Sequence, residues 1–428
     1  MHNDKESPFA LTLAGIGRRW PVTRFKGQEG LNQIYRFEVQ LTGPAPALDI
    51  AQWLQTPAFL SLGEDHGIHG MIDSASVEYR HPQQTVYHLV LVPALHSLDR
   101  SPKRRVWHAM SVPQILRQLL DEHGESPQPY RLELDDRHYP VRPFCIQYAE
   151  SDLQWLQRLC EEEGIHYHFT HQPDGHVLVL ADDTLNFAPE PLVTPFHSGS
   201  LQEVARPVIW SLFQRHGQPA EGTTQPGTHP QQLSRRTLER LRARHGQIHG
   251  HSTRAELLSS RIVQVEQHPI SPFNDQWLLI ETLHQYQQAT TASPFYRNQF
   301  TAIPWATPFR PPLKQPRPSI PGYQRGRVLG TQGQRAVLDE QGRLHVSLWP
   351  DETEEVGLWL PWMRPLANQP SRLPWAGAEV LVSFLDHDPD RPVVCGVLDQ
   401  PVPPPASPPR GDAQLLFDWL LYGPDITP

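Results

Sequence analysis

The chain has 428 residues, more than the about 100–200 residues of one typical domain, so two or three folding units are expected. Its net charge of −9 argues against a protein whose main partner is nucleic acid, because such proteins normally carry a basic face. No apolar run reaches the ~18 residues that a membrane span needs, and the N-terminus holds no apolar signal core. We therefore expect a cytoplasmic protein whose export would proceed without a signal peptide.

Proline is the outlier of the composition, with 46 residues in the chain. Since proline is excluded from helix interiors and central strands, many short elements joined by fixed turns are expected. The three cysteines, Cys145, Cys160 and Cys395, form neither a disulfide framework nor a CxxC metal motif. Together with the strand patterns below, this composition favours a mainly β fold with inserted helices.

The first hundred residues show the alternation of apolar and polar side chains that is typical of strands. Gly27 and Gly30 are expected to lie just before the second strand. The strand candidates are 9–13, 35–39, 70–79 and 86–92.

Two helices are predicted next, near 111–123 and 151–163. Each begins with a serine that is followed three residues later by glutamine, which is the capping-box pattern, and each ends at a glycine, Gly124 or Gly164. Directly after the second helix, a Pro-Asp-Gly sequence at 173–175 predicts the turn of a β-hairpin.

A stretch rich in Pro, Gly, Thr and Gln at about 190–232 predicts a long connection. A basic helix over Leu233–His245 and strands at 260–266 and 276–286 follow, and we expect the arginines of this helix to be solvated. Seven prolines between Pro304 and Pro321 indicate a semi-rigid, extended linker at a domain boundary.

The region 322–400 is compact and rich in short strands. Five or six strands in about 80 residues favour an OB-type barrel. The strand candidates are 326–329, 335–338, 343–349, 358–362, 380–385 and 393–397.

An ordered series of motifs over about residues 7–400 resembles the VgrG spike proteins of type VI secretion. The most specific stretch is QYAESDLQW (147–155) running into CEEEGI (160–165). The other motifs are FKGQEGL (25–31), SVPQIL (111–116), HQPDGHVLVLAD (171–182), YRNQFTAIP (296–304), DEQGRLHV (339–346) and FLDHDPDRP (384–392).

This resemblance implies a phage tail-hub-like β-barrel region at 1–320, an OB-fold barrel at 321–400, and a Pro-rich linker with a short apolar tail at 401–428. It implies a non-enzymatic homotrimer that connects the tail tube, an Hcp-type ring, and baseplate proteins to a tip or cargo, and that the type VI machine secretes from the cytoplasm. In this short form the C-terminal β-helix needle of the family is expected to be missing, because only about 28 residues follow the barrel. Binding of a tip protein is then in question.

Histidine is abundant, with 23 residues, and four of them form a candidate metal site. His166 and His168 share one strand face, and His171 and His176 flank the next turn, so a zinc ligand set is conceivable. No cysteine or carboxylate nearby completes a four-ligand sphere. We therefore favour surface or trimer-contact histidines and expect no metal and no cofactor.

The residue patterns that could indicate catalysis are each better explained by a structural role. The chain has no GxSxG motif, and Cys145 and Cys160 are better explained as small core residues than as nucleophiles. The carboxylate runs at 161–163 and 386–390 are expected to be solvated rather than paired across a substrate cleft. The tryptophans of the barrel are expected to pack or to contact a subunit, because a net charge of −4 over 322–400 opposes nucleic-acid binding.

A second hypothesis is an adaptor that holds an effector through the apolar tail, because contiguous exposed apolar side chains usually mark a contact. A His-ligated metalloprotein is the least favoured alternative. The candidate contact residues of the tail are Leu415, Leu416, Phe417, Trp419, Leu420 and Tyr422.

Overall fold

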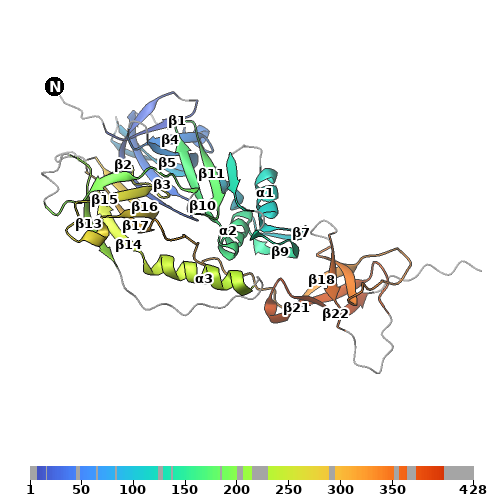
Figure 1. Ribbon diagram of the computed structural model, residues 1–428. Helices are drawn as coiled ribbons and strands as arrows, with labels where there is room; N and C mark the ends of the chain where they lie inside the picture. The colour runs from blue at the N-terminus through green and yellow to red at the C-terminus, as the bar shows by residue number, and fades with distance from the viewer. Residues whose placement is uncertain are drawn as a thin grey trace, which may run out of the picture. The chain divides into compact units, whose positions relative to one another are not determined.

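The computed structural model divides the chain into two compact units, the first formed by residues 1–103, 110–142 and 150–317, and the second by 104–109, 143–149 and 318–428 (Figure 1). Strands dominate both units, which confirms the mainly β prediction. Within the described ranges, no helix has the length and apolar character that crossing a membrane requires. The structure describes residues 7–15, 17–44, 49–63, 66–81, 84–123, 129–135, 138–183, 186–199, 206–214, 230–288, 295–350, 356–363 and 373–399.

Six antiparallel strands close into a barrel at the start of the first unit. They pair in the order β1–β4–β5–β6–β3–β2, and β1 pairs with β2 again, which closes the ring. Side chains alternate along each strand, so that Trp20, Val22 and Phe25 of β2 are buried between polar neighbours that face outward. The strands are β1 (Ala10–Leu13), β2 (Arg19–Gly30), β3 (Arg36–Pro44), β4 (Pro57–Ser61), β5 (Gly67–His81) and β6 (Gln84–Val92).

A second barrel of six strands follows in the same unit. Its strands pair in the order β13–β14–β17–β16–β15–β12, and a bridge between Phe196 and Ile209 connects the end of β12 with β13. Val263, Leu279 and Phe300 lie in its core. The strands are β12 (Leu192–Pro195), β13 (Ile209–Gln214), β14 (Ile248–Ser252), β15 (Ile262–Glu266), β16 (Gln276–Gln287) and β17 (Phe295–Pro304).

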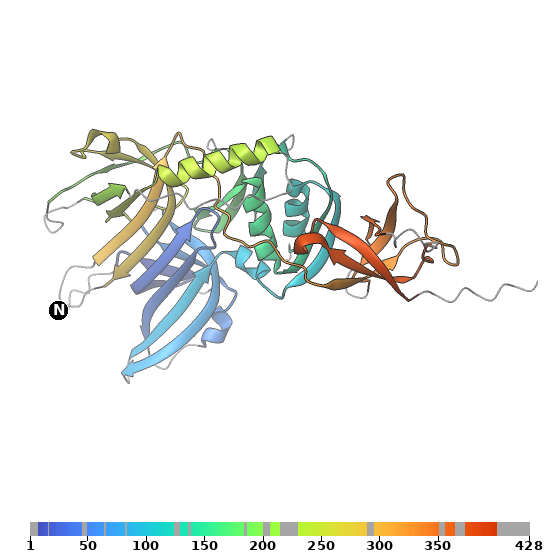
Figure 2. The same cartoon turned by 90° about the horizontal axis from the view of Figure 1, so that it is seen from below.

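The two barrels share a seam, because β2 of the first pairs with β16 of the second (Figure 2). Gly27 and Gly30 come before the strand predicted at 35–39, which is β3, but they lie inside β2, a strand that was not predicted. Gly27 fits there because the ring of Phe37 occupies the place of a side chain: a Cβ on Gly27 would lie 2.1 Å from Phe37 Cε1.

Two helices and a small sheet are inserted between the barrels, and both predicted helices are confirmed as α1 (Val112–Glu122) and α2 (Asp152–Glu163). The backbone N–H of Ser151 donates to Gln154 Oε1 at 3.0 Å, as the capping box requires, and Gly164 ends α2 with a φ of 74°. The predicted hairpin is β10 (His166–Gln172) with β11 (Gly175–Ala181), and β8 (Tyr130–Glu133) pairs with β11. Gly124 lies outside the described residues.

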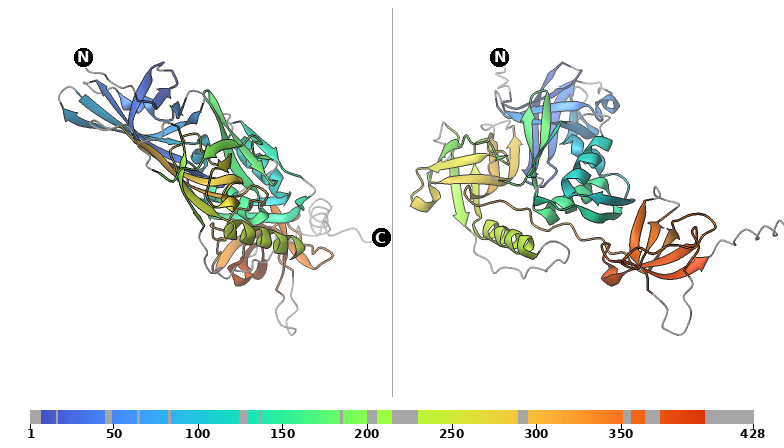
Figure 3. Two further views of the ribbon diagram at one scale, coloured as in Figure 1. Left: turned by 60° about the vertical axis from the view of Figure 1, so that its left-hand side comes forward. Right: turned by 45° about the vertical axis from the view of Figure 1, so that its right-hand side comes forward.

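The basic helix is α3 (Pro230–His245), which begins three residues before the predicted start. It lies beside α2 in each view (Figures 2 and 3). A segment without regular structure, 305–317, follows β17 and ends the first unit.

The second unit is a five-stranded barrel. Its strands pair in the order β20–β19–β18–β21–β22, and a bridge between Trp362 and Val394 connects its two outer strands. The separate strand predicted at 335–338 was wrong, because this stretch makes only isolated bridges, at Arg335 and Leu338. The strands are β18 (Tyr323–Val328), β19 (Arg343–Leu348), β20 (Gly357–Pro361), β21 (Glu379–Phe384) and β22 (Pro392–Asp399).

Two strands from the insertion belong to this second unit for most of their length. They are β7 (Lys103–Met110) and β9 (Arg142–Glu150), which pair with each other. Ile146 of β9 joins the hydrophobic core of the barrel, and the rings of Tyr148 and Trp349 lie 5.7 Å apart. The barrel is therefore covered by a segment that lies about 180 residues earlier in the chain.

Candidate functional site

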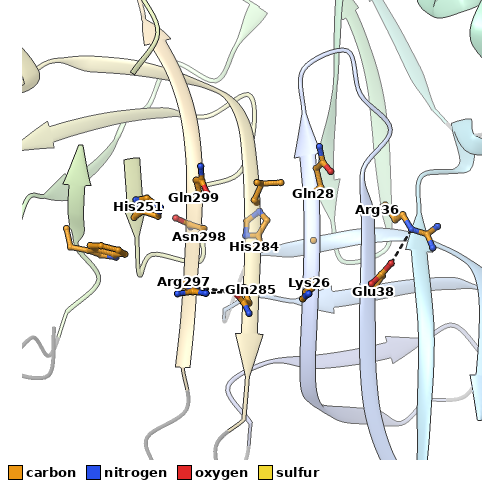
Figure 4. Close-up of a pocket in the computed structure, with 13 residues that line it drawn as sticks. Lys26, Gln28, Arg36, Glu38, His251, His284, Gln285, Arg297, Asn298 and Gln299 are labelled. Atoms are coloured by element: carbon orange, nitrogen blue, oxygen red, sulfur yellow. Dashed lines mark hydrogen bonds and ion pairs between the residues drawn. The ribbon is translucent and has the colours of Figure 1, made fainter. Parts of the chain in front are cut away.

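A pocket of about 570 Å³ lies on the outer face of the sheet that joins the two barrels (Figure 4). Strands of both barrels contribute to it, since β2 and β3 belong to the first barrel and β13, β14, β16 and β17 to the second. Its lining residues are Lys26, Gly27, Gln28, Arg36, Glu38, Trp210, His251, Leu283, His284, Gln285, Arg297, Asn298 and Gln299.

The register of the strands arranges the outward side chains of this pocket in two rows. One row crosses four strands through Glu38, Lys26, Gln285 and Arg297, each directly opposite the next. The second row crosses five strands and contains Arg36, Gln28, Leu283, Gln299 and His251. Since the side-chain period of a strand is two, this arrangement follows once β2 and β16 are paired in this register.

The pocket is rich in positive charge and in side-chain amides. Arg36 lies 3.6 Å from Glu38, while Arg297 donates from Nε and Nη2 to Gln285 Oε1 at 3.0 and 2.8 Å. Lys26 is a third cation at the surface of the pocket. Three cations against one carboxylate among the lining residues make a face that attracts an acidic or strongly polar partner.

An aromatic pair forms one wall of the pocket. The rings of Trp210 and His251 are stacked with their centroids 4.8 Å apart. Burial and the neighbouring Arg297 lower the pKa of His251, so this imidazole is neutral at pH 7. A flat aromatic wall beside cations and amides supports binding, and the lining residues do not include a nucleophile with an adjacent base.

A buried polar network lies directly beneath this face. His284 Nε2 lies 3.1 Å from Glu29 Oε1, and His284 Nδ1 lies 2.8 Å from the hydroxyl of Tyr296. Glu29 also accepts hydrogen bonds from the backbone N–H and the hydroxyl of Ser259, at 2.9 and 3.2 Å. Because Glu29 belongs to β2 and its partners to the second barrel, the network ties the two barrels together.

Three of the four histidines of the candidate metal site are buried and His171 is partly buried, so the expectation of surface histidines was wrong for His166, His168 and His176. His166 and His168 are 1% and 5% exposed and pack against the ring of Phe187. His171 and His176 lie opposite each other on β10 and β11 and converge on His69.

Burial lowers the pKa of each of these histidines and keeps the imidazoles neutral. The value falls to about 4 for His168 and to about 3 for both His171 and His176. Among the described residues, no group of three or more His, Cys, Asp or Glu side chains is arranged to hold a metal ion. The histidines therefore act as core residues of the insertion.

The glutamate run at the end of α2 was also expected to be solvated, and this prediction was wrong. Glu161, Glu162 and Glu163 are 5%, 7% and 3% exposed. Glu163 lies between two arginines, with Arg142 Nη2 at 2.5 Å and Arg236 Nη1 at 2.8 Å. Glu162 likewise pairs with Arg158 and Arg142, while the carboxylate of Glu161 accepts the backbone N–H groups of Lys314 and Gln315, so all three are held by protein groups.

The predicted solvated face of the basic helix is confirmed for Arg235, Arg242 and Arg244, which are exposed, and was wrong for Arg236 and Arg240. Arg236 of α3 is 8% exposed and donates to Glu163, while Arg240 donates to the backbone oxygen of Glu161. Arg235, by contrast, extends into solvent and pairs with Glu239 at 2.9 Å.

The tryptophans of the second unit pack as expected. Trp349 is 4% exposed in the core, and Trp362 packs against the same cluster. Trp359 stacks on His345 at 4.7 Å, and Arg335 lies 4.7 Å above the ring of Trp375.

The predicted contact residues of the tail lie outside the described residues, as does the whole stretch 400–428. Several pocket residues lie in the motifs at 25–31 and 296–304, but they were not predicted to form a site. The signal that marks them is the alternation Arg24-Phe25-Lys26-Gly27-Gln28-Glu29, whose outward positions are all cationic or amide side chains.

Two family profiles match the chain. The family described as "Phage tail baseplate hub (GPD)" matches residues 28–222, and the "Type VI secretion system/phage-baseplate injector OB domain" matches residues 325–398.

Curated relatives match across nearly the whole chain. The type VI secretion system spike protein VgrG4b of Pseudomonas aeruginosa is 33% identical, over 91% of this chain and 56% of its own length. The spike protein VgrG5 of the same organism is 34% identical, over 92% of this chain and 57% of its own length. The chain thus spans a little over half the length of these relatives.

A solved structure of a type VI secretion component is also similar to this chain. The E. coli c3393 protein is described as a component of the type VI secretion system with structural similarity to the T4 bacteriophage tail proteins gp27 and gp5. It matches with a TM-score of 0.75 at 25% identity, over 91% of this chain and 99% of that chain.

Proposed function

Because the chain belongs to the VgrG family of type VI secretion spike proteins, we propose that it is a structural hub at the base of the spike of a contractile injection machine. The observation that carries this proposal is the pair of six-stranded barrels joined along β2 and β16, followed by a separate five-stranded barrel. Its role is mechanical, and the buried, arginine-paired carboxylates of α2 support a structural rather than a catalytic use of these residues.

The proposed assembly is a homotrimer. Closed cyclic symmetry lets identical subunits bury matching surfaces, and two barrels in each of three copies would present a ring of six similar units to a ring-shaped tube. The proposed partners are an Hcp-type tube ring on one side and baseplate proteins around it. The protein would act in the cytoplasm until the machine expels it.

Native mass spectrometry tests the trimer directly. At micromolar concentration, alone or with the tube ring protein, the expected species has three times the 48.9 kDa mass of the chain. A chain that remains monomeric under both conditions contradicts the proposal.

The cationic pocket is the candidate contact for an acidic segment of a partner. Charge reversal of Lys26 and Arg297 to Glu should weaken co-assembly at least tenfold and abolish its salt dependence, because charge across an interface acts mainly on the rate of association. Arg131→Glu is the matched control, since Arg131 is an exposed arginine that pairs with Glu133 at 3.5 Å. Equal loss in the control would assign the effect to net charge rather than to the pocket.

The second candidate function is the effector adaptor, which rests on the apolar side chains of the tail (Leu415, Leu416, Phe417, Trp419, Leu420 and Tyr422). Deletion of residues 411–428 should abolish capture of the cargo while thermal unfolding of the rest stays unchanged. Full recovery of the same cargo by the shortened chain would rule this function out.

A further inference from the structure

The pocket on the seam between the barrels has two chemically different ends. The end on β13 and β14 is aromatic, with Trp210 and His251, whereas the end on β2 and β3 carries Lys26 and Arg36. Arg297 on β17 lies between the two ends (Figure 4). A ligand that fits both ends must itself have an aromatic part and an acidic part.

A β-bulge places the tryptophan of the aromatic end on the outer face. The pairing of β13 with β14 shifts between Ile209 and Ser211, so Trp210 is the extra residue. Because of this shift, Ile209 and Leu212 both pack on the barrel core, while the indole of Trp210 stacks on His251. Bulges commonly re-aim a side chain next to a functional site, and Trp210 is aimed at this pocket.

The aromatic surface continues along the same two strands. Phe213 lies opposite His249, and their rings stack with the centroids 5.4 Å apart. The ring of Phe213 also lies 6.5 Å from that of His251, and both side chains are partly exposed. Two neighbouring stacked pairs on the outer face of a sheet form a platform on which a further planar ring can pack.

Polar atoms at this end of the pocket are left without partners. Among the described residues, Trp210 Nε1, His251 Nδ1 and Asn298 Oδ1 have no hydrogen-bond partner. Asn298 is 1% exposed and lines the pocket, and its amide nitrogen donates to the backbone oxygen of Arg254 at 2.7 Å. Unpaired buried polar atoms are rare in folded proteins, so their position at the lining of a pocket favours a ligand that is itself polar.

Two cations of the pocket are available for carboxylates. Arg297 and Lys26 are both exposed, and neither forms an ion pair with another residue that the structure describes. The guanidinium of Arg297 donates only to the neutral amide of Gln285 within the pocket. A carboxylate from a partner would gain a charge-assisted hydrogen bond from each of them.

The spacing of these groups across the sheet matches the spacing of alternate side chains in an extended peptide. Strands lie about 4.8 Å apart, so Arg297 is one strand from His251, and Lys26 is three strands, or about 14 Å, from it. In an extended chain, side chains on one face recur about every 7 Å. A ring packed at His251 therefore brings the residue two positions later to Arg297 and the residue four positions later to Lys26.

We propose that the pocket is a recognition site for an extended segment of a partner protein with the pattern aromatic-x-acidic-x-acidic, which crosses the strands from β14 to β2. The ring packs beside Trp210 and His251, and the carboxylates pair with Arg297 and Lys26. This recognition rests on the proposed contact of the pocket with an acidic partner, and it specifies the aromatic residue and the spacing. A single-stranded nucleic acid fits less well, because it needs a continuous basic groove and Glu38 interrupts the cations here.

Fluorescence anisotropy of a labelled synthetic peptide measures the recognition on the full chain. The peptide GSWSDSDSG should bind, and its binding should weaken about tenfold when alanine replaces the tryptophan or asparagine replaces both aspartates. The peptide GSWDDSSSG has the same composition without the spacing, and it should bind more weakly than the first. Equal affinity of the tryptophan and alanine peptides, or of the two spacings, would overturn the proposal.

Variants of the chain locate the bound peptide. Trp210→Ala should remove the preference for the tryptophan peptide over the alanine peptide, and Arg297→Gln should reduce the preference for aspartate over asparagine. Trp359→Ala is the matched control, because Trp359 is a tryptophan of the second unit that is 37% exposed and also stacks on a histidine, His345. Thermal unfolding checks that each variant is folded, and the exposed Arg297 keeps the site testable if the bulge does not tolerate the loss of its tryptophan.

The outcomes separate this site from the hub function. Specific peptide binding by a chain that never trimerises would support the site and contradict the hub. Absence of binding by every peptide, while charge reversal of Lys26 and Arg297 still weakens co-assembly, would overturn the site and leave the hub intact. Binding of a labelled oligothymidylate that is tighter than that of the peptide and is lost in Trp210→Ala would overturn the peptide site in favour of a nucleic acid.

Discussion

The Nδ1 atoms of His69 and His176 lie 2.9 Å apart, so these two imidazoles share one hydrogen bond inside the first unit. His176 Nε2 accepts the backbone N–H of Ala94 at 3.4 Å, which requires that the proton of neutral His176 is on Nδ1. Nδ1 of His69 is then the acceptor. His171 Nδ1 in turn accepts the backbone N–H of His69 at 3.3 Å. All three imidazoles must be neutral for these contacts to form.

Acid should therefore destabilise the first unit. Burial, followed by the neighbouring imidazole of His69, lowers the pKa of His176 to about 3, against the ordinary value of 6.5. Burial also lowers the pKa of His69, although Asp174 opposes this. Between pH 6.5 and about 3 the unfolded chain therefore binds a proton that folded His176 does not, so the free energy of unfolding falls by about 1.4 kcal/mol for each unit by which the pH is lowered.

Urea unfolding between pH 7.5 and 5 measures this slope. His176→Gln should be less stable than the wild type at pH 7.5, and its stability should fall less steeply with pH, by about one proton. His88→Gln is the control, since His88 is an exposed histidine paired with Glu78. An unchanged slope in His176→Gln would show that the cluster does not carry the pH response.

Arg158 is the arginine whose loss should destabilise the first unit most. Its side chain is 4% exposed and lies 2.6 Å from Glu150 and 2.8 Å from Glu162. Arg158→Ala leaves two buried carboxylates without this charge, which costs about 3–5 kcal/mol of unfolding free energy. Denaturation with separate fits for the two units measures the loss. Arg131→Ala, at an exposed pair, should cost less than about 1 kcal/mol, and equal effects of the two changes would contradict the assignment.

The thiols should react in two classes. Cys145 and Cys160 are buried, and burial raises the pKa of Cys160, so neither presents a thiolate to a reagent in the folded state. Cys395 is partly exposed. Titration with a disulfide reagent at pH 8 should therefore modify one thiol per native chain and three after unfolding in guanidinium. Rapid native modification of Cys160 would place α2 outside the stable core.

Local signals in the sequence were enough to predict the helices and most of the strands. The capping box of Ser151 and the glycine at 164 determine both ends of α2 within a dozen residues, and alternation identifies strands wherever one face is buried. The environment of the α2 carboxylates was not predictable in the same way. Arg236 lies 73 residues from Glu163, and Lys314 lies 153 residues from Glu161, so a run of glutamates looks solvated until the fold brings its partners to it.

The pocket illustrates the same limit. The outward position of Lys26 follows from alternation in β2, but its neighbours depend on which strand pairs with β2. The bond between Gln28 and Glu281 spans 253 residues, and no local pattern specifies that pairing or its register. The cationic face could therefore be recognised only in the folded chain.

A single methyl group added at Gly27, on the β2 side of the seam between the barrels, should destabilise the fold. Gly27 lies opposite Phe37 on β3 and His284 on β16, and a Cβ at this position would lie 2.1 Å from Phe37 Cε1. Phe37 is fully buried, so its ring has little room to move, and Gly27→Ala should cost about 1–3 kcal/mol. Gly175→Ala is the matched control, because a Cβ at that strand position meets no atom within 4 Å. Thermal unfolding compares the two, and since the ring of Phe37 also lies 5.5 Å from that of His284, Gly27→Ala should in addition accelerate amide exchange along β2 and β16. A Gly27→Ala chain as stable as the control would show that the ring can leave its place, and that the close approach of β2 to β3 at this position is not needed for stability.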